Sequence, residues 1–417
     1  MKHILVVEDS PMVLKVLKQF IAQYEDLKPQ FAETLGQATE LIARATTPFF
    51  ACLADLGLPD APNGEIVEFC LAKKIPTIVL TGSYNEENRN SLLARGVVDY
   101  VVKESRFAYE YAVKLLVRLT KNEETHVLVT DDSITARTHL KKLLKTHLFN
   151  VSEAKDGKEA VAMLEKNPDI KLLITDFNMP VMDGIELTKH VRRKMGNNQL
   201  IIIALSSESD RYLSARFIKN GASDFLKKPF IHEEFYCRIM HNLEERELLE
   251  KVQDYADRDP LTDLYNRRYF NKKAEAMIAE NEKLGITMAL CMIGIDNFND
   301  INDRLGHDCG DHLLIEFSKS LTTNIGMFVS SRYGGGEFAI LMPKFTAEKA
   351  ARLTDEFRDF TSTQAIAYRD EKINITLSAG VCEIENSDFP AALKSSYQSL
   401  RKAKKQGFNC VVHTNPA

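Results

Sequence analysis

Long apolar runs, paired cysteines and a strong charge bias are all missing from this 417-residue sequence. No segment approaches the ~18 apolar residues of a membrane span, and the first apolar run is too short for a signal-peptide core. The seven cysteines are scattered without a C-x-x-C pair, which argues against a disulfide framework or a zinc site. A net charge of -5 provides no overall electrostatic attraction to nucleic acid or to an anionic membrane. These absences predict a cytoplasmic protein with free thiols, no nucleic-acid partner and no membrane span.

An internal repeat dominates the first part of the chain. Copy one opens with HILVVEDS at His3, and copy two opens with HVLVTDDS at His126. In each copy the apolar runs end at an acid pair, a single acid, a hydroxyl and a lysine. From acid to acid to hydroxyl to lysine the steps are 46, 26 and 22 residues in copy one, and 44, 30 and 22 in copy two. Four landmarks recurring in order at matched spacing indicate a duplicated domain.

Both copies alternate short β-branched apolar runs with segments of helical periodicity. This alternation is typical of an α/β fold, here a flavodoxin-like, doubly wound parallel sheet. Each landmark follows directly after an apolar run, so it should lie at the carboxyl end of a strand. Open α/β sheets bind their ligands at that edge.

The chemistry expected at this edge is phosphoryl transfer. Three carboxylates repel one another unless a cation neutralises them, and oxygen ligands suit a hard ion such as Mg²⁺. A lysine and a hydroxyl at the same rim would contact a phosphoryl group, which implies an aspartyl-phosphate. The predicted metal ligands are Glu8, Asp9 and Asp55 in copy one, and Asp131, Asp132 and Asp176 in copy two.

Residues 1–120 and 124–243 resemble the receiver domain of two-component response regulators. The resemblance implies that Asp55 and Asp176 accept phosphoryl groups from a histidine kinase or a phosphotransfer protein. It assigns switch hydroxyls (Thr81, Ser206), switch aromatics (Tyr100, Phe225) and phosphoryl-contacting lysines (Lys103, Lys228). The alternative is a flavodoxin-like domain with incidental acids.

The two copies differ after the lysine. Copy two has the family's Lys228-Pro229, a bond that is often cis, whereas copy one has Lys103-Glu104. The loop around Lys103 is therefore expected to have a different geometry from its counterpart.

Two helices are expected at the ends of the copies. Residues 105–119 read as the last helix of copy one, followed by the polar connector KNEET. The last helix of copy two begins near Ile231 and meets no Gly or Pro before Pro260, so it should continue through a linker at 244–258. Leu248, Val252 and Tyr255 follow four-then-three spacing, which fits either a short coiled-coil seam or a solvated helix with a narrow apolar stripe.

Three segments of the last part of the chain carry a second resemblance. DRDPLTDLYNRRYF, IDNFNDINDRLGHDCGD and SRYGGGEFAIL resemble the GGDEF domain of diguanylate cyclases, from about 257 to 413. This implies an α/β, nucleotidyl cyclase-like domain, assigned to 259–417, with a strand–Gly-Gly turn–strand hairpin. The order receiver, receiver, GGDEF resembles that of PleD-like response regulators. Active members of this family join two GTP molecules into cyclic di-GMP across a homodimer.

The phosphate and metal subsite departs from the family pattern. Gly294 and Gly336 stand where two metal-binding acids are expected, Asn299 replaces a lysine and Phe408 replaces an arginine, while Lys404 is retained. Loss of one preorganised electrostatic contact costs on the order of 10²–10³ in rate. The sequence therefore predicts an inactive cyclase. Ile325 and Phe328 replace the R-x-x-D of the product site, so feedback by cyclic di-GMP is not expected.

The guanine subsite is retained by resemblance at Asn302 and Asp311. These residues either bind GTP or a related guanine nucleotide, or simply cap helices. Three hypotheses follow: an output domain that contacts a cyclase, phosphodiesterase or kinase; an active cyclase rescued by Asp296 or Glu337; and a nucleotide sensor without turnover.

Overall fold

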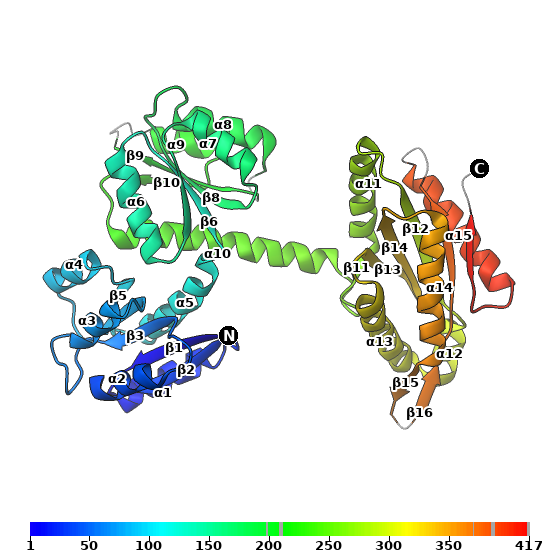
Figure 1. Ribbon diagram of the computed structural model, residues 1–417, viewed down its shortest axis with the longest axis horizontal. Coiled ribbons are helices and arrows are strands. Elements are labelled where there is room, and N and C mark those ends of the chain that lie inside the picture. The colour runs from blue at the N-terminus through cyan, green and yellow to red at the C-terminus, as the bar shows by residue number, and fades with distance from the viewer. Residues whose placement is uncertain (197–198, 208–211, 370, 385–387, 415–417) are drawn as a thin grey trace. The chain divides into compact units, whose positions relative to one another are not determined.

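The computed structural model describes residues 1–196, 199–207, 212–369, 371–384 and 388–414. The chain divides into two compact units, Met1–Glu247 and Leu248–Ala417. Figure 1 shows three α/β bodies along the chain, coloured blue for copy one, cyan to green for copy two, and yellow to red for the C-terminal unit. None of the described helices combines the length and apolar content that crossing a membrane requires.

Copy one is a five-stranded parallel sheet in the order β2-β1-β3-β4-β5. This order is the flavodoxin-like one. Helices α1 and α5 contribute to the core on one face, and α2, α3 and α4 contribute to the core on the other. The elements are β1 (Lys2–Val7), α1 (Pro11–Ile21), β2 (Leu27–Ala32), α2 (Leu35–Arg44), β3 (Ala51–Asp55), α3 (Glu65–Ala72), β4 (Thr77–Thr81), α4 (Glu86–Ala94), β5 (Asp99–Val102) and α5 (Arg106–Asn122).

Copy two repeats this topology, with strand order β10-β9-β8-β6-β7. Its first helix begins as in copy one: the serine after the acid pair, Ser133 here and Ser10 there, accepts a hydrogen bond from the helix backbone. The expected cis bond is confirmed at Lys228-Pro229. The elements are β6 (His126–Thr130), α6 (Ile134–Thr146), β7 (Asn150–Ala154), α7 (Gly157–Lys166), β8 (Ile170–Asp176), α8 (Gly184–Lys194), β9 (Ile201–Ser206), α9 (Leu213–Lys219), β10 (Asp224–Lys227) and α10 (His232–Asp257).

The two helices expected at the ends of the copies are both present. Helix α10 runs without interruption to Asp257, as the absence of Gly and Pro predicted. Helix α5 ends at Asn122, three residues later than expected. The extra turn is stabilised because buried Asn122 accepts a hydrogen bond from Arg118 Nε at 2.9 Å and donates one to His147 O at 2.9 Å.

The C-terminal domain, defined here as Leu248–Ala417, is built on a six-stranded mixed sheet in the order β11-β13-β14-β12-β17-β18. Helices α13 and α14 contribute to the core on one face, and α11 and α15 to the core on the other. The expected hairpin is confirmed by β13 and β14. The elements are β11 (Tyr265–Asn266), α11 (Arg267–Lys283), β12 (Met288–Ile295), α12 (Phe298–Leu305), α13 (His307–Ile325), β13 (Val329–Gly334), β14 (Glu337–Pro343), α14 (Ala347–Thr363), β15 (Ala365–Tyr368), β16 (Glu371–Asn374), β17 (Leu377–Glu383), α15 (Phe389–Lys405) and β18 (Val411–Thr414).

Candidate functional site

The acidic edge of copy one is assembled by two neighbouring parallel strands, β1 and β3. Glu8 and Asp9 follow β1, and Asp55 is the last residue of β3. These side chains offer one oxygen each, all within 4.8 Å of one another. A donor set made only of carboxylate oxygens fits a hard divalent cation. Glu8, Asp9 and Asp55 are therefore the residues that would hold Mg²⁺.

Lys103 joins this cluster from the end of β5. Its Nζ lies 2.7 Å from Glu8 Oε2 and 2.7 Å from Asp55 Oδ2. Burial would lower the pKa of Lys103, but the hydrogen bonds to Asp55 and Glu8 outweigh burial and the pKa is raised. The pKa of Glu8 is also raised because burial disfavours its charged form more than Lys103 favours it. A cation at this site would stabilise the carboxylates further.

The two expected switch residues of copy one meet at a single carbonyl. Thr81 Oγ1 and Tyr100 OH each donate a hydrogen bond to Ser83 O at 3.1 Å. Both residues are buried; Thr81 is the last residue of β4 and Tyr100 lies within β5. A change of partner at Thr81 would therefore reach Tyr100 through Ser83.

Copy two places its site residues at the same edge, with a different arrangement of the acids. Lys228 Nζ lies 2.7 Å from Asp131 Oδ2 and 2.5 Å from Asp176 Oδ1. Asp132 is exposed, and among the described residues these three acids do not form a cluster as close as that of copy one. The pKa of Asp176 is raised, chiefly by burial. Copy two thus has the lysine bridge without the compact set of oxygens.

The remaining site residues of copy two lie on the neighbouring strands. Ser206, the last residue of β9, is buried. The half-buried Phe225 on β10 packs against the copy-two core, with its ring centroid 6.0 Å from that of Phe217. These positions match those of Thr81 and Tyr100 in copy one.

Two neighbouring glycines, Gly294 and Gly336, occupy the positions expected to hold metals in the C-terminal domain; we call this pair the glycine corner. Gly294 on β12 pairs with Glu337 on β14, and Ile295 N donates to Gly336 O at 3.0 Å. The two glycines are therefore neighbours. A Cβ at residue 294 would lie 2.9 Å from Lys404 Nζ, and a Cβ at residue 336 would lie 2.9 Å from the Phe298 ring. The Lys404 ammonium group and the Phe298 ring thus lie where the side chains of two metal-binding acids would start.

The neighbouring acids have other partners. Asp296 is buried and accepts hydrogen bonds from Thr376 Oγ1, Ser378 Oγ and Asn409 N at 2.7–2.9 Å. Glu337 accepts one from Tyr397 OH at 2.9 Å, and burial together with Glu337 raises the pKa of that phenol. With these donors in place, the donor set around the two glycines does not fit a pair of divalent metals.

The two residues expected to read guanine lie on consecutive helices, Asn302 on α12 and Asp311 on α13. Asn302 Oδ1 is buried and has no hydrogen-bond partner among the described residues. A Cβ at residue 310 would lie only 1.8 Å from this oxygen, so the Asn302 side chain lies directly against Gly310, next to Asp311, and would have to shift to admit a larger residue. Asp311 itself is exposed. The pair therefore offers one unfilled acceptor and one accessible carboxylate.

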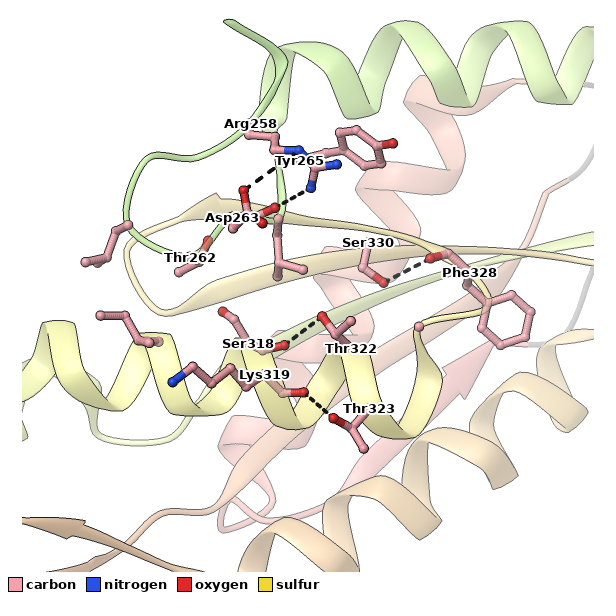
Figure 2. A pocket seen from close by; sticks show the side chains of 14 residues that line it. Arg258, Thr262, Asp263, Tyr265, Ser318, Lys319, Thr322, Thr323, Phe328 and Ser330 are labelled. Carbon is pink, nitrogen blue, oxygen red and sulfur yellow. Dashed lines mark hydrogen bonds and ion pairs between the residues drawn. The ribbon is translucent and has the colours of Figure 1, made fainter. Parts of the chain in front are cut away.

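A separate open cleft of about 560 Å³ lies between the turn after α10 and helix α13 (Figure 2). Arg258 holds the turn by donating to Asp263 O at 2.6 Å and by stacking over the Tyr265 ring. Phe328 lines this cleft, and Ile325 is buried in the core. Neither residue of the former R-x-x-D offers a charge to a nucleotide.

Several functional candidates have no counterpart in the sequence motifs. Arg89, His147 and Glu233 make hydrogen bonds between the two copies. No local pattern marks these residues, because each partner is at least 49 residues away in the chain. They become visible only when the copies are folded.

Two protein families match this chain. The profile described as "Response regulator receiver domain" matches residues 4–109 and 127–240. The profile described as "Diguanylate cyclase, GGDEF domain" matches residues 256–410. The two receiver matches together cover more than half of the chain.

Individual relatives match parts of this chain. The response regulator PleD of Caulobacter vibrioides is 28% identical over 277 residues, which is 61% of this chain and 61% of PleD. A diguanylate cyclase of Vibrio cholerae is 33% identical over 171 residues, 40% of this chain and 53% of that protein. A crystal structure described as a two-component system response regulator/GGDEF domain protein is 42% identical, with a TM-score of 0.56, over 59% of this chain and 100% of that one. This chain thus spans about three fifths of the length of PleD.

Proposed function

Because the chain belongs to the response regulator receiver family and ends in a GGDEF domain, we propose that it accepts phosphoryl groups on Asp55 and Asp176 and controls an output domain that does not make cyclic di-GMP. One observation supports the absence of cyclic di-GMP synthesis. Gly294 and Gly336 are neighbours, and Lys404 Nζ lies beside Gly294. Glycine has no ligand atom, and the nearby acids are engaged elsewhere.

The phosphoryl step uses groups already placed at the sheet edge. A carboxylate oxygen of Asp55 or Asp176 attacks the phosphorus of a phosphohistidine, the P–N bond breaks, and the imidazole leaves with its proton restored from solvent. Lys103 or Lys228 holds positive charge beside the incoming oxygens. Bound Mg²⁺ would neutralise further charge on the phosphoryl group.

The output is proposed to act through protein contacts. Leu248, Val252 and Tyr255 on α10 have exposed fractions of 63%, 57% and 82%, which supports a helix pair in a homodimer. A cyclase, phosphodiesterase or kinase is the class of partner proposed for the C-terminal domain. A histidine kinase or phosphotransfer protein is the proposed donor.

Restoring the missing side chains tests the inactive corner. The variant Gly294→Asp, Gly336→Asp, Asn299→Lys, Phe408→Arg should gain cyclic di-GMP synthesis from GTP and Mg²⁺, whereas the unaltered protein should match the enzyme-free blank. Gly334→Asp is the matched control, because a Cβ there meets nothing within 4 Å and the new carboxylate is two residues from the corner. Product from the unaltered protein would overturn this proposal.

A second candidate function is guanine nucleotide binding without turnover, and the unpartnered Asn302 Oδ1 supports it. An unfilled buried acceptor costs about 1–3 kcal/mol, which a guanine N–H donor would recover. Calorimetry with GTP and with cyclic di-GMP tests this candidate. Heat with GTP and not with cyclic di-GMP is expected, and no heat with GTP would exclude it.

A further inference from the structure

The turn that carries the acid pair contacts a different side chain of the following helix in each receiver copy. Leu14 N donates to Ser10 O at 2.9 Å in copy one, and Arg137 N donates to Ser133 O at 3.0 Å in copy two. The two serines are the N-caps of α1 and α6, so Leu14 and Arg137 occupy the same position in the two copies. A buried leucine of copy one is therefore an arginine in copy two.

The Arg137 side chain binds the backbone of the acid pair in copy two. Its Nη1 donates to Asp131 O at 2.7 Å and to Asp132 O at 3.2 Å. The side chain is only 14% exposed. Hydrogen bonds from an ionised donor are stronger than bonds between neutral groups. Arg137 thus fixes the backbone from which two of the three predicted metal ligands project.

Arg137 is itself held by a carboxylate. Its Nε lies 3.8 Å from Glu153 Oε2 on β7, and Lys141 forms an ion pair with the other oxygen of Glu153. Both cations lie on α6, one turn apart. Glu153 therefore keeps the arginine in place beside the acid pair.

Copy one has an aromatic ring where copy two has this carboxylate. Phe31 on β2 pairs in register with Val6, and Glu153 on β7 pairs with Val129. Each valine lies two residues before the acid pair of its copy. Phe31 packs against the core of copy one, with Lys18 Nζ 4.7 Å from the centre of its ring. The two copies are thus built differently beneath their acid pairs.

The acid side chains differ between the copies at the same turn. In copy one Glu8, Asp9 and Asp55 bring oxygens within 4.8 Å of one another. In copy two Asp132 is exposed, and the described residues of this copy contain no comparable cluster. The acids are therefore spread apart in the copy whose turn is bound by an arginine.

We propose that Arg137 is a positioning residue that lowers the affinity of copy two for Mg²⁺, so that copy one binds the ion at lower concentrations. Two effects act in the same direction. The hydrogen bonds to Asp131 O and Asp132 O hold the turn with the Asp132 side chain in solvent. The guanidinium is always charged, so it also repels a divalent cation at the neighbouring acids. The inference rests on the proposed function, in which Mg²⁺ serves the phosphoryl step.

Binding of Mn²⁺, a hard ion that takes the same oxygen ligands, tests this role in the full-length protein without a phosphodonor. Electron paramagnetic resonance follows the free ion. Asp9→Asn with Asp55→Asn removes the site of copy one, so that copy two is measured alone. In this background Arg137→Leu, which installs the copy-one residue, should tighten Mn²⁺ binding by about tenfold, or roughly 1.4 kcal/mol. Damage to the fold would weaken binding, so the sign of the change separates positioning from a structural role.

Two further variants at this turn sharpen the result. Lys141→Leu is the matched control: it removes the other cation beside Glu153, and because its side chain is 45% exposed it should change the affinity by less than about threefold. Arg137→Gln, which removes the charge but keeps a donor, should tighten binding less than Arg137→Leu. Unchanged or weaker binding in both Arg137 variants would overturn the inference. Tightening by Asp131→Glu alone would overturn it too, because the difference would then come from the length of the acid.

The reverse background separates this inference from the proposed function. Asp132→Asn with Asp176→Asn leaves only copy one, which should bind Mn²⁺ about tenfold more tightly than copy two alone. Equal affinities of the two copies would overturn the inference. Absence of binding by copy one would instead count against the metal site of the proposed function. The Arg137 variants are compared within copy two, so their result decides the role of this arginine by itself.

Discussion

The acidic edge of copy one and the glycine corner of the C-terminal domain make an informative contrast. In copy one Glu8, Asp9 and Asp55 bring three oxygens within 4.8 Å, and Lys103 lies against two of them. In the C-terminal domain the strands still place residues 294 and 336 side by side, but neither has a side chain. A lysine is present in both. The contrast shows that strands can bring two residues side by side without supplying ligand atoms, so function must be argued from the side chains.

The largest expected effect is loss of phosphoryl acceptance. Asp55→Asn with Asp176→Asn should reduce incorporation from a small-molecule phosphodonor to background, because an amide oxygen is a poor nucleophile. Intact mass spectrometry gives the number of phosphoryl groups per chain. The exposed Asp26→Asn is the control and should retain full incorporation. Retained phosphate in the double variant would mean that another residue is the acceptor.

The next largest effect comes from replacing Lys103 at the acidic edge, compared with replacing Lys404 at the glycine corner. Lys103→Met should slow phosphorylation of copy one by about 10²–10³, the cost of one preorganised electrostatic contact. Lys404→Met should leave phosphorylation unchanged, because its ammonium belongs to the glycine corner. Quench-flow rates of phosphoryl incorporation in a chain bearing Asp176→Asn isolate copy one. Equal phosphorylation rates with and without Lys103 would show that this lysine does not assist phosphoryl transfer.

The guanine subsite should respond more weakly. Asn302→Ala is expected to weaken GTP binding by about tenfold, since one hydrogen bond contributes roughly 0.5–1.5 kcal/mol. The exposed Asn324→Ala on the neighbouring helix α13 serves as the control. Calorimetric titration of both variants decides the matter: unchanged affinity in Asn302→Ala would return this residue to a purely structural role.

The smallest effect is a pH dependence of stability that should be larger in the receiver unit than in the C-terminal domain. Burial lowers the pKa of His147 well below 6.5, and His232 is shifted the same way for the same reason. Below pH 6.5 the unfolded chain binds protons that the folded unit excludes, so stability is full above this pH and falls on acidification. Between its unfolded and folded pKa values, each such histidine should cost at most about 1.4 kcal/mol per pH unit.

The measurement for this prediction is urea unfolding followed by circular dichroism at pH 7.5 and pH 5.5. His147→Gln should reduce the loss of stability in the receiver unit. In the C-terminal domain His307 and His413 are exposed, so its transition should move less. Equal pH shifts in the two transitions would contradict this account.

The sequence predicts the sheet edges well because their chemistry is local. Asp55, Thr81 and Lys103 each follow an apolar strand, and parallel strands bring such residues to one edge. The continuous helix α10 was predictable for a similar reason, since no Gly or Pro interrupts it. In both cases the pattern that predicts the structure lies within a short stretch of the sequence.

Contacts between distant segments could not be predicted. Arg89 meets Glu233 across 144 residues, and His147 meets Val98 across 49. The looser placement of Asp132 is also not apparent from the sequence, since both copies carry two consecutive acids before a serine, Glu8-Asp9 in copy one and Asp131-Asp132 in copy two. These features depend on packing between elements rather than on spacing within them.

The most direct test of the contrast is a cyclic di-GMP assay on the unaltered full-length protein with GTP and Mg²⁺, with and without beryllofluoride. Mass spectrometry of the reaction should find no product in either state, because the glycine corner has no ligands to hold the metals. Product that appears with beryllofluoride would contradict the account and make this protein a phosphorylation-activated cyclase.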